Sequence, residues 1–313
     1  KVALLPEGEA ALIRVAGVLL ILVFAVKGAL VPLQFWLPAT YAHAPGPVAA
    51  LFAVMTKVGA YATLRLYTLV FPPDTPATGA LFADLLLPAA LVTLAVGSIG
   101  VIGASTLARL VAFATIASMG TLFTAIAQFT PAATAAALYY MIHSTLAGAT
   151  MFLVADLVAD RRAHDGLHRA LPPIAQGGLI GGLFLAGAIA MAGMPPLSGF
   201  VGKLLVLDAT RGAQMGLIWP TILITSLITI LGFARAGSTL FWKAHASVGE
   251  VAEHRTEALS FAMVFVLLAG LAALTIFAGP VMDYTQATAA ELFDRSGYIA
   301  ANVLPGAQPG ATP

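Results

Sequence analysis

The chain has 313 residues, of which 60% are hydrophobic and only 9% are charged, and its mean hydropathy is +0.95. Soluble domains carry about a quarter charged residues, so this composition excludes a water-soluble enzyme. The net charge of +1 gives no reason to expect nucleic acid as a partner. The absence of cysteine excludes disulfides, thiolate metal sites, iron–sulfur ligation and a cysteine nucleophile. Lys1 stands in place of a start methionine without signal-peptide features, so we expect a fragment of a longer protein.

Long uncharged runs define the expected architecture, because about 18 apolar residues suffice to cross a bilayer. They predict an all-α polytopic membrane protein with about eight transmembrane helices, two of them discontinuous. The expected spans are Ala10–Val31 with a proline-broken continuation to Pro47, Val48–Val70, Ala83–Gly103, Leu107–Gln128, Ala132–Val158, Ile174–Leu207 interrupted by Gly193-Met194-Pro195-Pro196, Leu217–Phe241 and Ala258–Val281. The last thirty or so residues become polar and predict a frayed tail.

Basic residues in the loops indicate the orientation. If the spans alternate, six lie on one side of the membrane (Arg109, Arg161, Arg162, Arg169, Lys243 and Arg255) and five on the other (Lys1, Arg14, Arg65, Arg211 and Arg295). The segment 160–169 is the densest basic loop. We therefore predict that the Arg161-Arg162 loop is cytoplasmic and that both chain ends face outward.

Three lysines, Lys27, Lys57 and Lys203, fall within the predicted spans. A charged lysine at the bilayer centre costs about 2.5–3.5 kcal/mol, so it persists where something offsets that cost or where the charge is used. Desolvation penalises the ammonium form, which lets a buried lysine exchange a proton near neutral pH as arginine cannot. Snorkelling of the amines to the interface is the alternative. Lys57 fits that alternative least, because it lies well inside its span.

Helix-breaking residues accompany two of these lysines. Gly28 and Pro32 follow Lys27, while Gly193, Pro195 and Pro196 precede Lys203. Glycine and proline inside a span open backbone hydrogen bonds, and transporters place ion sites at such discontinuous helices. We therefore predict that the lysines belong to a proton path.

His143 lies in the middle of the fifth predicted span and can pass a proton between its two ring nitrogens. Tyr139, four residues earlier, is expected to reach it by a hydrogen bond. A structural histidine satisfied by a neighbouring helix is the alternative.

Hydroxyl groups recur along the fourth span, at Thr115, Ser118, Thr121 and Thr124. Packing contacts are the expected role of this stripe and a water-lined path the alternative. Asp84, Asp156 and Asp208 are expected at the interface, towards span ends. Nucleotide, metalloprotease and hydrolase motifs are absent, so no cofactor or metal site is predicted.

Several motifs resemble those of the proton-translocating antiporter-like subunits shared by respiratory complex I and Mrp-type cation/proton antiporters. The motifs are Phe24–Pro38, Ala44–Val48, Thr56–Tyr61, Tyr140–Leu146 and Gly193–Lys203, and the resemblance runs from about Ala10 to Ile299. Within this family the sequence is most similar to the D subunits of Mrp antiporters. Two features favour that branch: Lys203, where the resemblance implies a glutamate in complex I relatives, and the ending from Tyr284 to Ile299.

The resemblance implies the C-terminal part of a fourteen-helix fold built from two inverted five-helix repeats. Residues 1–73 then hold the last two helices of the first repeat, 80–247 the second repeat, 256–283 the final helix and 284–313 a polar tail. It further implies a proton-translocation chain of Lys27, Lys57, His143 and Lys203. The family's glutamate partner of Lys27 is not present, since Glu7 and Glu9 fall just outside the predicted membrane segment.

The resemblance also implies a function: a proton-translocating subunit of a multi-subunit Na⁺/H⁺ antiporter in a bacterial inner membrane, with other antiporter subunits as partners. A proton-pumping subunit of complex I or of a membrane-bound hydrogenase is the alternative. A passive scaffold would also fit if the lysines proved dispensable. An intramembrane enzyme has no visible nucleophile or metal cluster in its favour.

Overall fold

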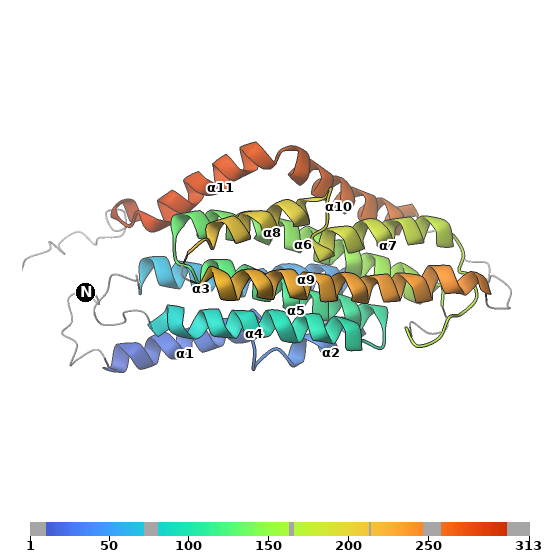
Figure 1. The fold of residues 1–313 in the computed structure, drawn as a ribbon, viewed down its shortest axis with the longest axis horizontal. Coiled ribbons are helices and arrows are strands. Elements are labelled where there is room, and N and C mark those ends of the chain that lie inside the picture. The colour runs from blue at the N-terminus through green and yellow to red at the C-terminus, as the bar shows by residue number, and fades with distance from the viewer. Residues whose placement is uncertain (1–10, 72–80, 163–165, 213, 247–257, 299–313) are drawn as a thin grey trace, which may run out of the picture.

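The computed structural model of the chain describes residues 11–71, 81–162, 166–212, 214–246 and 258–298. These residues form helices, apart from connecting turns and one isolated β-bridge between Thr106 and Gly166. The helices lie roughly side by side in an elongated bundle (Figure 1). They are α1 (Ala11–Lys27), α2 (Trp36–His43), α3 (Gly46–Leu69), α4 (Leu81–Gly103), α5 (Leu107–Ile126), α6 (Pro131–Asp160), α7 (Gly177–Ala192), α8 (Ser198–Ala209), α9 (Met215–Gly237), the π-helical segment η3 (Ser238–Trp242), the 3₁₀ turn η4 (Lys243–Ala246), α10 (Ala258–Ile276) and α11 (Ala278–Phe293). The predicted all-α fold is confirmed.

Six of the described helices are long and apolar enough to cross a membrane: α3, α4, α5, α6, α9 with η3, and α10. They coincide with six of the predicted spans. The other two predicted spans correspond to the 17-residue helix α1 with its continuation α2, and to the pair α7 and α8. Both of these spans are interrupted, as the glycines and prolines predicted.

The break between α7 and α8 begins at Gly193. Its φ of +75° lies in the left-handed region, where a side chain would be strained, and its amide donates to the carbonyls of Ile189 and Ala190. The Pro195-Pro196 pair cannot continue the helical hydrogen bonds, and α8 starts at Ser198. These residues therefore end one half-helix and start the next within a single predicted span.

Side chains of α4 and α2 stabilise the break between α1 and α2. After Lys27 the chain makes turns around Pro32, and the Val31 amide donates to Thr93 Oγ1 of α4 at 2.8 Å. Trp36 begins α2, and its indole donates to Val26 O at 2.9 Å. Side chains thus satisfy backbone groups that the missing helical turns leave open.

The centre of the bundle is α5, in which 17 of the 20 residues are buried. It packs closely on α4, where glycines let the two backbones approach. A methyl group placed on Gly97 would lie 2.8 Å from Ala117 Cα, and one placed on Gly120 would lie 2.6 Å from Leu94 Cα. Small residues therefore fix the spacing of the two helices around which the others pack.

The polar C-terminal segment differs from the prediction. Residues 284–293 continue α11 rather than forming a frayed tail, and Thr285 and Ala289 are buried. The physical reason is contact with the bundle, because α11 packs against α6 and α3. Residues 299–313 lie outside the described part of the chain.

The three predicted interfacial aspartates have different environments. Asp84 is exposed, and Asp208 forms an exposed ion pair with Arg211 at 2.8 Å. Asp156 has a structural role, since its Oδ1 accepts from the Gly46 amide at 2.9 Å and so caps the start of α3. An anion at a helix N-terminus is stabilised by the helix dipole.

The contact between α4 and α5 generates the first prediction. We expect Gly97→Ala to destabilise the protein by about 1–3 kcal/mol, because the new methyl group meets backbone atoms of Ala117 and forces the helices apart. The measurement is equilibrium unfolding in mixed detergent micelles. Gly103→Ala is the matched control, since nothing lies within 4 Å of a methyl group there. Equal losses for the two variants would contradict the role assigned to Gly97.

Candidate functional site

Lys203 lies on α8 and reaches back across the break to the end of α7. Its Nζ donates to Ala192 O at 2.7 Å and to Ser226 Oγ of α9 at 2.8 Å. Gly193 makes room for this conformation, because a methyl group there would lie 3.1 Å from Nζ and closer to the stem carbons. The amine is therefore held at the C-terminal end of a half-helix, where backbone carbonyls carry partial negative charge.

His143 of α6 packs against the same interrupted span. It is buried, and its Nδ1 shares a hydrogen bond with Ser198 Oγ at 2.9 Å. A methyl group on Gly199 would lie 2.9 Å from Cε1 and Nε2 of the imidazole, so the ring rests on the start of α8. At this break, His143 therefore contacts the start of α8, and the amine of Lys203 contacts the end of α7.

The predicted hydrogen bond between Tyr139 and His143 is wrong. The Tyr139 hydroxyl donates instead to Leu274 O of α10 at 2.9 Å. The i, i+4 spacing places the two residues on one side of α6, but the long tyrosine side chain extends past the histidine to the neighbouring helix. The ring that packs beside His143 is that of Tyr140, at a centroid distance of 5.6 Å.

Lys57 lies on α3, which packs against α6, and only 4% of its surface is exposed. Among the described residues its Nζ has no hydrogen-bond partner. The side chain borders a groove of about 420 Å³ between α3 and α6, whose other walls include Met141, Ile142 and Thr145. Lys57 is therefore a buried amine that approaches the helix carrying His143.

Lys27 ends α1, as its predicted position beside the break requires, but its predicted burial is wrong. The side chain is exposed, because α1 packs mainly against α3 and Gly17 is its one buried residue. Its stem still lies beside α3, since a methyl group on Gly59 would lie 3.0 Å from Lys27 Cβ. Lys27 and Lys57 therefore lie on neighbouring helices. Glu7 and Glu9 are outside the described residues.

Part of the predicted hydroxyl stripe borders a polar cavity next to Lys203. Ser118 and Thr121 of α5 line it together with Thr225 and Ser226 of α9. The cavity has a volume of about 10 Å³, on the order of a single water position. Ser118 Oγ is buried and has no hydrogen-bond partner among the described residues.

The other hydroxyls of the stripe are satisfied within α5. Thr115 donates to Val111 O, and Thr124 donates to Gly120 O. They fit the packing role. Thr121 lines the cavity but also donates within α5, to Ala117 O.

Sequence reasoning missed Ser198 and Ser226 as site residues. Ser198 follows Pro195-Pro196 after a single leucine, so its place at the start of a half-helix was a usable signal. Ser226 had none, since it is one hydroxyl among several on α9 and only packing brings it to Lys203. Within the described ranges no three histidine or acidic side chains lie close enough to hold a metal ion.

The fold and the site define a class of protein. The chain is a multi-pass helical membrane protein with two interrupted helices, and amines lie at both interruptions. The transmembrane family described as NADH:quinone oxidoreductase/Mrp antiporter matches residues 7–229, and the chain belongs to this family.

Individual relatives agree with this assignment. The chain is 34% identical to the D subunit of the Na⁺/H⁺ antiporter of Bacillus subtilis (strain 168), over 90% of its own length and 57% of that protein. It is 33% identical to a protein of Rhizobium meliloti (strain 1021) named as the D subunit of a probable K⁺/H⁺ antiporter, over 93% of its length and 59% of that protein. The chain thus spans less than two thirds of these curated relatives.

A solved structure shares the fold. A chain of the Mrp complex from Dietzia sp. DQ12-45-1b matches with a TM-score of 0.80 and 23% identity, over 94% of this chain and 62% of the other. At this identity the match shows the common fold alone.

The hydrogen bond of His143 generates the second prediction. We expect Ser198→Ala to destabilise the protein by about 1–3 kcal/mol, because it leaves a buried imidazole nitrogen without a partner. Ser144→Ala is the control, since the Ser144 hydroxyl is also buried but donates within α6 to Met141 O. Unfolding in mixed micelles is the measurement, and a loss no larger than that of the control would contradict the assignment.

Lys57 generates the third prediction. We expect Lys57→Met to stabilise the protein by about 1–3 kcal/mol, because an apolar side chain of similar length replaces a buried donor that has no partner among the described residues. The comparison is Lys203→Met, which removes the donor to Ala192 and Ser226 and should destabilise. The same unfolding measurement applies, and a destabilised Lys57→Met would show that the amine has a partner in solution.

Proposed function

We propose that the chain is part of a proton-translocating subunit of a multi-subunit monovalent cation/proton antiporter. Sodium is the proposed exchanged cation and a bacterial inner membrane the proposed location, with the Arg161-Arg162 loop in the cytoplasm. Similarity to proteins named as Na⁺/H⁺ and K⁺/H⁺ antiporter subunits supports this choice. The proposed partners are other subunits of the antiporter complex.

The observation that carries the proposal is the Lys203 amine at the end of α7. The carbonyl of Ala192 and the hydroxyl of Ser226 stabilise the ammonium, and no carboxylate among the described residues pairs with it. Because neither partner carries a full charge, the amine can also exist in its neutral form, in which it still donates to one of them. A group that is stable in both protonation states can relay protons.

The proposed path follows helix contacts across the bundle. Lys27 and Lys57 lie on the neighbouring helices α1 and α3, and α3 packs against α6, which carries His143. His143 contacts the start of α8 through Ser198, and α8 carries Lys203. The cavity at Ser118 and Thr121 then connects Lys203 with hydroxyls of α5 and α9. Water molecules between these groups would complete the transfer of protons.

The redox-coupled alternative uses the same chain of residues. A subunit of complex I or of a membrane-bound hydrogenase would move protons through these groups with energy from an electron-transfer partner. The curated relatives, which are named as antiporter subunits, favour the cation exchanger. A passive scaffold is the remaining class, and it requires that none of the four ionisable residues matter for transport.

Lys203 generates the fourth prediction. We expect Lys203→Arg, in the complete antiporter complex, to lower Na⁺/H⁺ exchange by at least about tenfold, since arginine keeps its charge and cannot release the proton. Lys203→Ala should lower it as strongly. Exchange is measured in everted membrane vesicles by a pH-sensitive dye, after purification has shown that the variant complex assembles.

The matched control is Lys243→Arg, which makes the same substitution at an exposed lysine just after η3. It should leave exchange unchanged. Wild-type exchange in Lys203→Ala would contradict the relay and support the scaffold. Loss of assembly in Lys203→Ala but normal exchange in Lys203→Arg would reduce Lys203 to a structural cation.

A further inference from the structure

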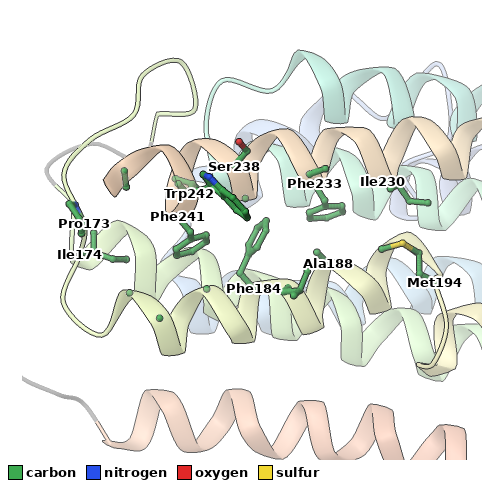
Figure 2. Close-up of a pocket in the computed structure, with 18 residues that line it drawn as sticks. Pro173, Ile174, Phe184, Ala188, Met194, Ile230, Phe233, Ser238, Phe241 and Trp242 are labelled. Atoms are coloured by element: carbon green, nitrogen blue, oxygen red, sulfur yellow. The ribbon is translucent and has the colours of Figure 1, made fainter. Parts of the chain in front are cut away.

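A cavity of about 780 Å³ lies between α7 and the segment formed by α9 and η3. Figure 2 shows Phe184 and Ala188 of α7 facing Phe233 and Phe241 across it. The volume falls within the range of about 300–1,000 Å³ that ligand sites occupy. It lies apart from the proposed proton path, whose residues do not line it.

The walls of the cavity select an apolar occupant. None of the eighteen lining residues is charged. On α7 the wall includes Gly177, Gly178 and Gly181, and the absence of side chains there creates the space. The opposite wall belongs to a segment long and apolar enough to cross the membrane. A segment that crosses a membrane is surrounded by hydrocarbon, so an acyl chain is an occupant whose chemistry matches these walls.

Charged groups lie beside one end of the cavity, although no charged residue lines it. Trp242 lies there with 82% of its surface exposed, as tryptophans at the membrane interface commonly do. Two arginines from the end of α6 reach the same end. Arg162 Nη2 donates to the carbonyl of the lining residue Leu240 at 2.6 Å. Arg161 Nε donates at 3.0 Å to Gln176, the residue before Gly177.

These arginines retain donors that the described residues do not use. Arg162 is only 8% exposed, and its Nε and Nη1 lack hydrogen-bond partners, as does Nη2 of Arg161. Burial lowers the pKa of Arg162, which shows the same lack of compensation for its charge. Leaving a buried donor unpaired costs about 1–3 kcal/mol, more for a charged group. The planar guanidinium matches the oxygens of a carboxylate or a phosphate, and the phosphate is the anion that a phospholipid supplies.

We propose that this cavity binds an anionic phospholipid, with an acyl chain between α7 and α9 and the phosphate at Arg161 and Arg162. The two parts of such a lipid match adjoining parts of the fold. The apolar cavity accepts the acyl chain, and the two guanidinium groups beside its interfacial end accept the phosphate. Neither forms an ion pair with a carboxylate among the described residues. A zwitterionic head group would bring a second cation to them, so the site should prefer a lipid with net negative charge.

The test measures lipid retention by native mass spectrometry of the purified protein. The probes are phosphatidylglycerol and phosphatidylcholine with identical acyl chains. We expect Gly178→Leu to lower retention of phosphatidylglycerol by roughly tenfold, because the leucine fills the acyl-chain position. Gly182→Leu is the matched control: it lies on the same helix, nothing lies within 4 Å of a methyl group at either glycine, and Gly182 does not line the cavity. Equal effects of the two variants would overturn the site.

A second pair of variants tests whether the site requires an anionic head group. Because Arg162 is buried, the test uses the half-buried Arg161, and Arg161→Gln should remove most of the preference for phosphatidylglycerol over phosphatidylcholine. Arg169→Gln removes an exposed charge from the same loop and should leave the preference intact. Equal retention of the two lipids by the unaltered protein would overturn the anionic head group. Displacement of the lipid by inorganic phosphate alone would overturn the acyl-chain contribution.

Discussion

The attraction between an amine and the C-terminal end of a half-helix is the interaction on which the candidate site depends. The last carbonyls of a helix carry partial negative charge and lack partners inside the helix. In this chain α1 ends with Lys27 itself, and the end of α7 accepts a hydrogen bond from Lys203. The break between α7 and α8 therefore holds a cation that pairs with no carboxylate among the described residues.

The two lysines lie differently at the two breaks: Lys27 is exposed, whereas Lys203 donates to the end of α7. Lys27 belongs to the half-helix that ends, whereas Lys203 belongs to the half-helix that follows and extends back over Gly193. A side chain at position 193 would occupy the path of the lysine stem, so the left-handed glycine has two functions: it ends α7 and it admits the amine. A proline or glycine pattern in the sequence indicates the first function but not the second.

The spans and the breaks could be predicted from the sequence because both are local properties. Hydropathy identifies a segment that is stable in lipid, and glycine or proline identifies where its backbone hydrogen bonds end. The partners of individual side chains could not be predicted in this way. Tyr139 bonds to Leu274, 135 residues away, and Lys27 is exposed because of how α1 packs. Such facts depend on which helix faces meet, and helices that are apolar all round give little information about that.

The C-terminal segment also shows that local sequence properties do not predict the effect of packing. Its polar composition predicted a tail, yet α11 is helical to Phe293, where contacts with α6 and α3 stabilise it. Composition describes the medium that a segment prefers when isolated. Packing against a formed bundle adds a contribution that composition does not contain.

The position of α6 explains why a histidine, rather than a fourth lysine, stands between the lysines. α6 packs against α3, which carries Lys57, and against α8, which carries Lys203. A third ammonium between two others would raise the repulsion in a medium that screens charge poorly. An imidazole can be neutral while both lysines are charged, and it still offers one donor and one acceptor. Ser198 fixes one of its nitrogens, while Nε2 lies against Gly199 at the break.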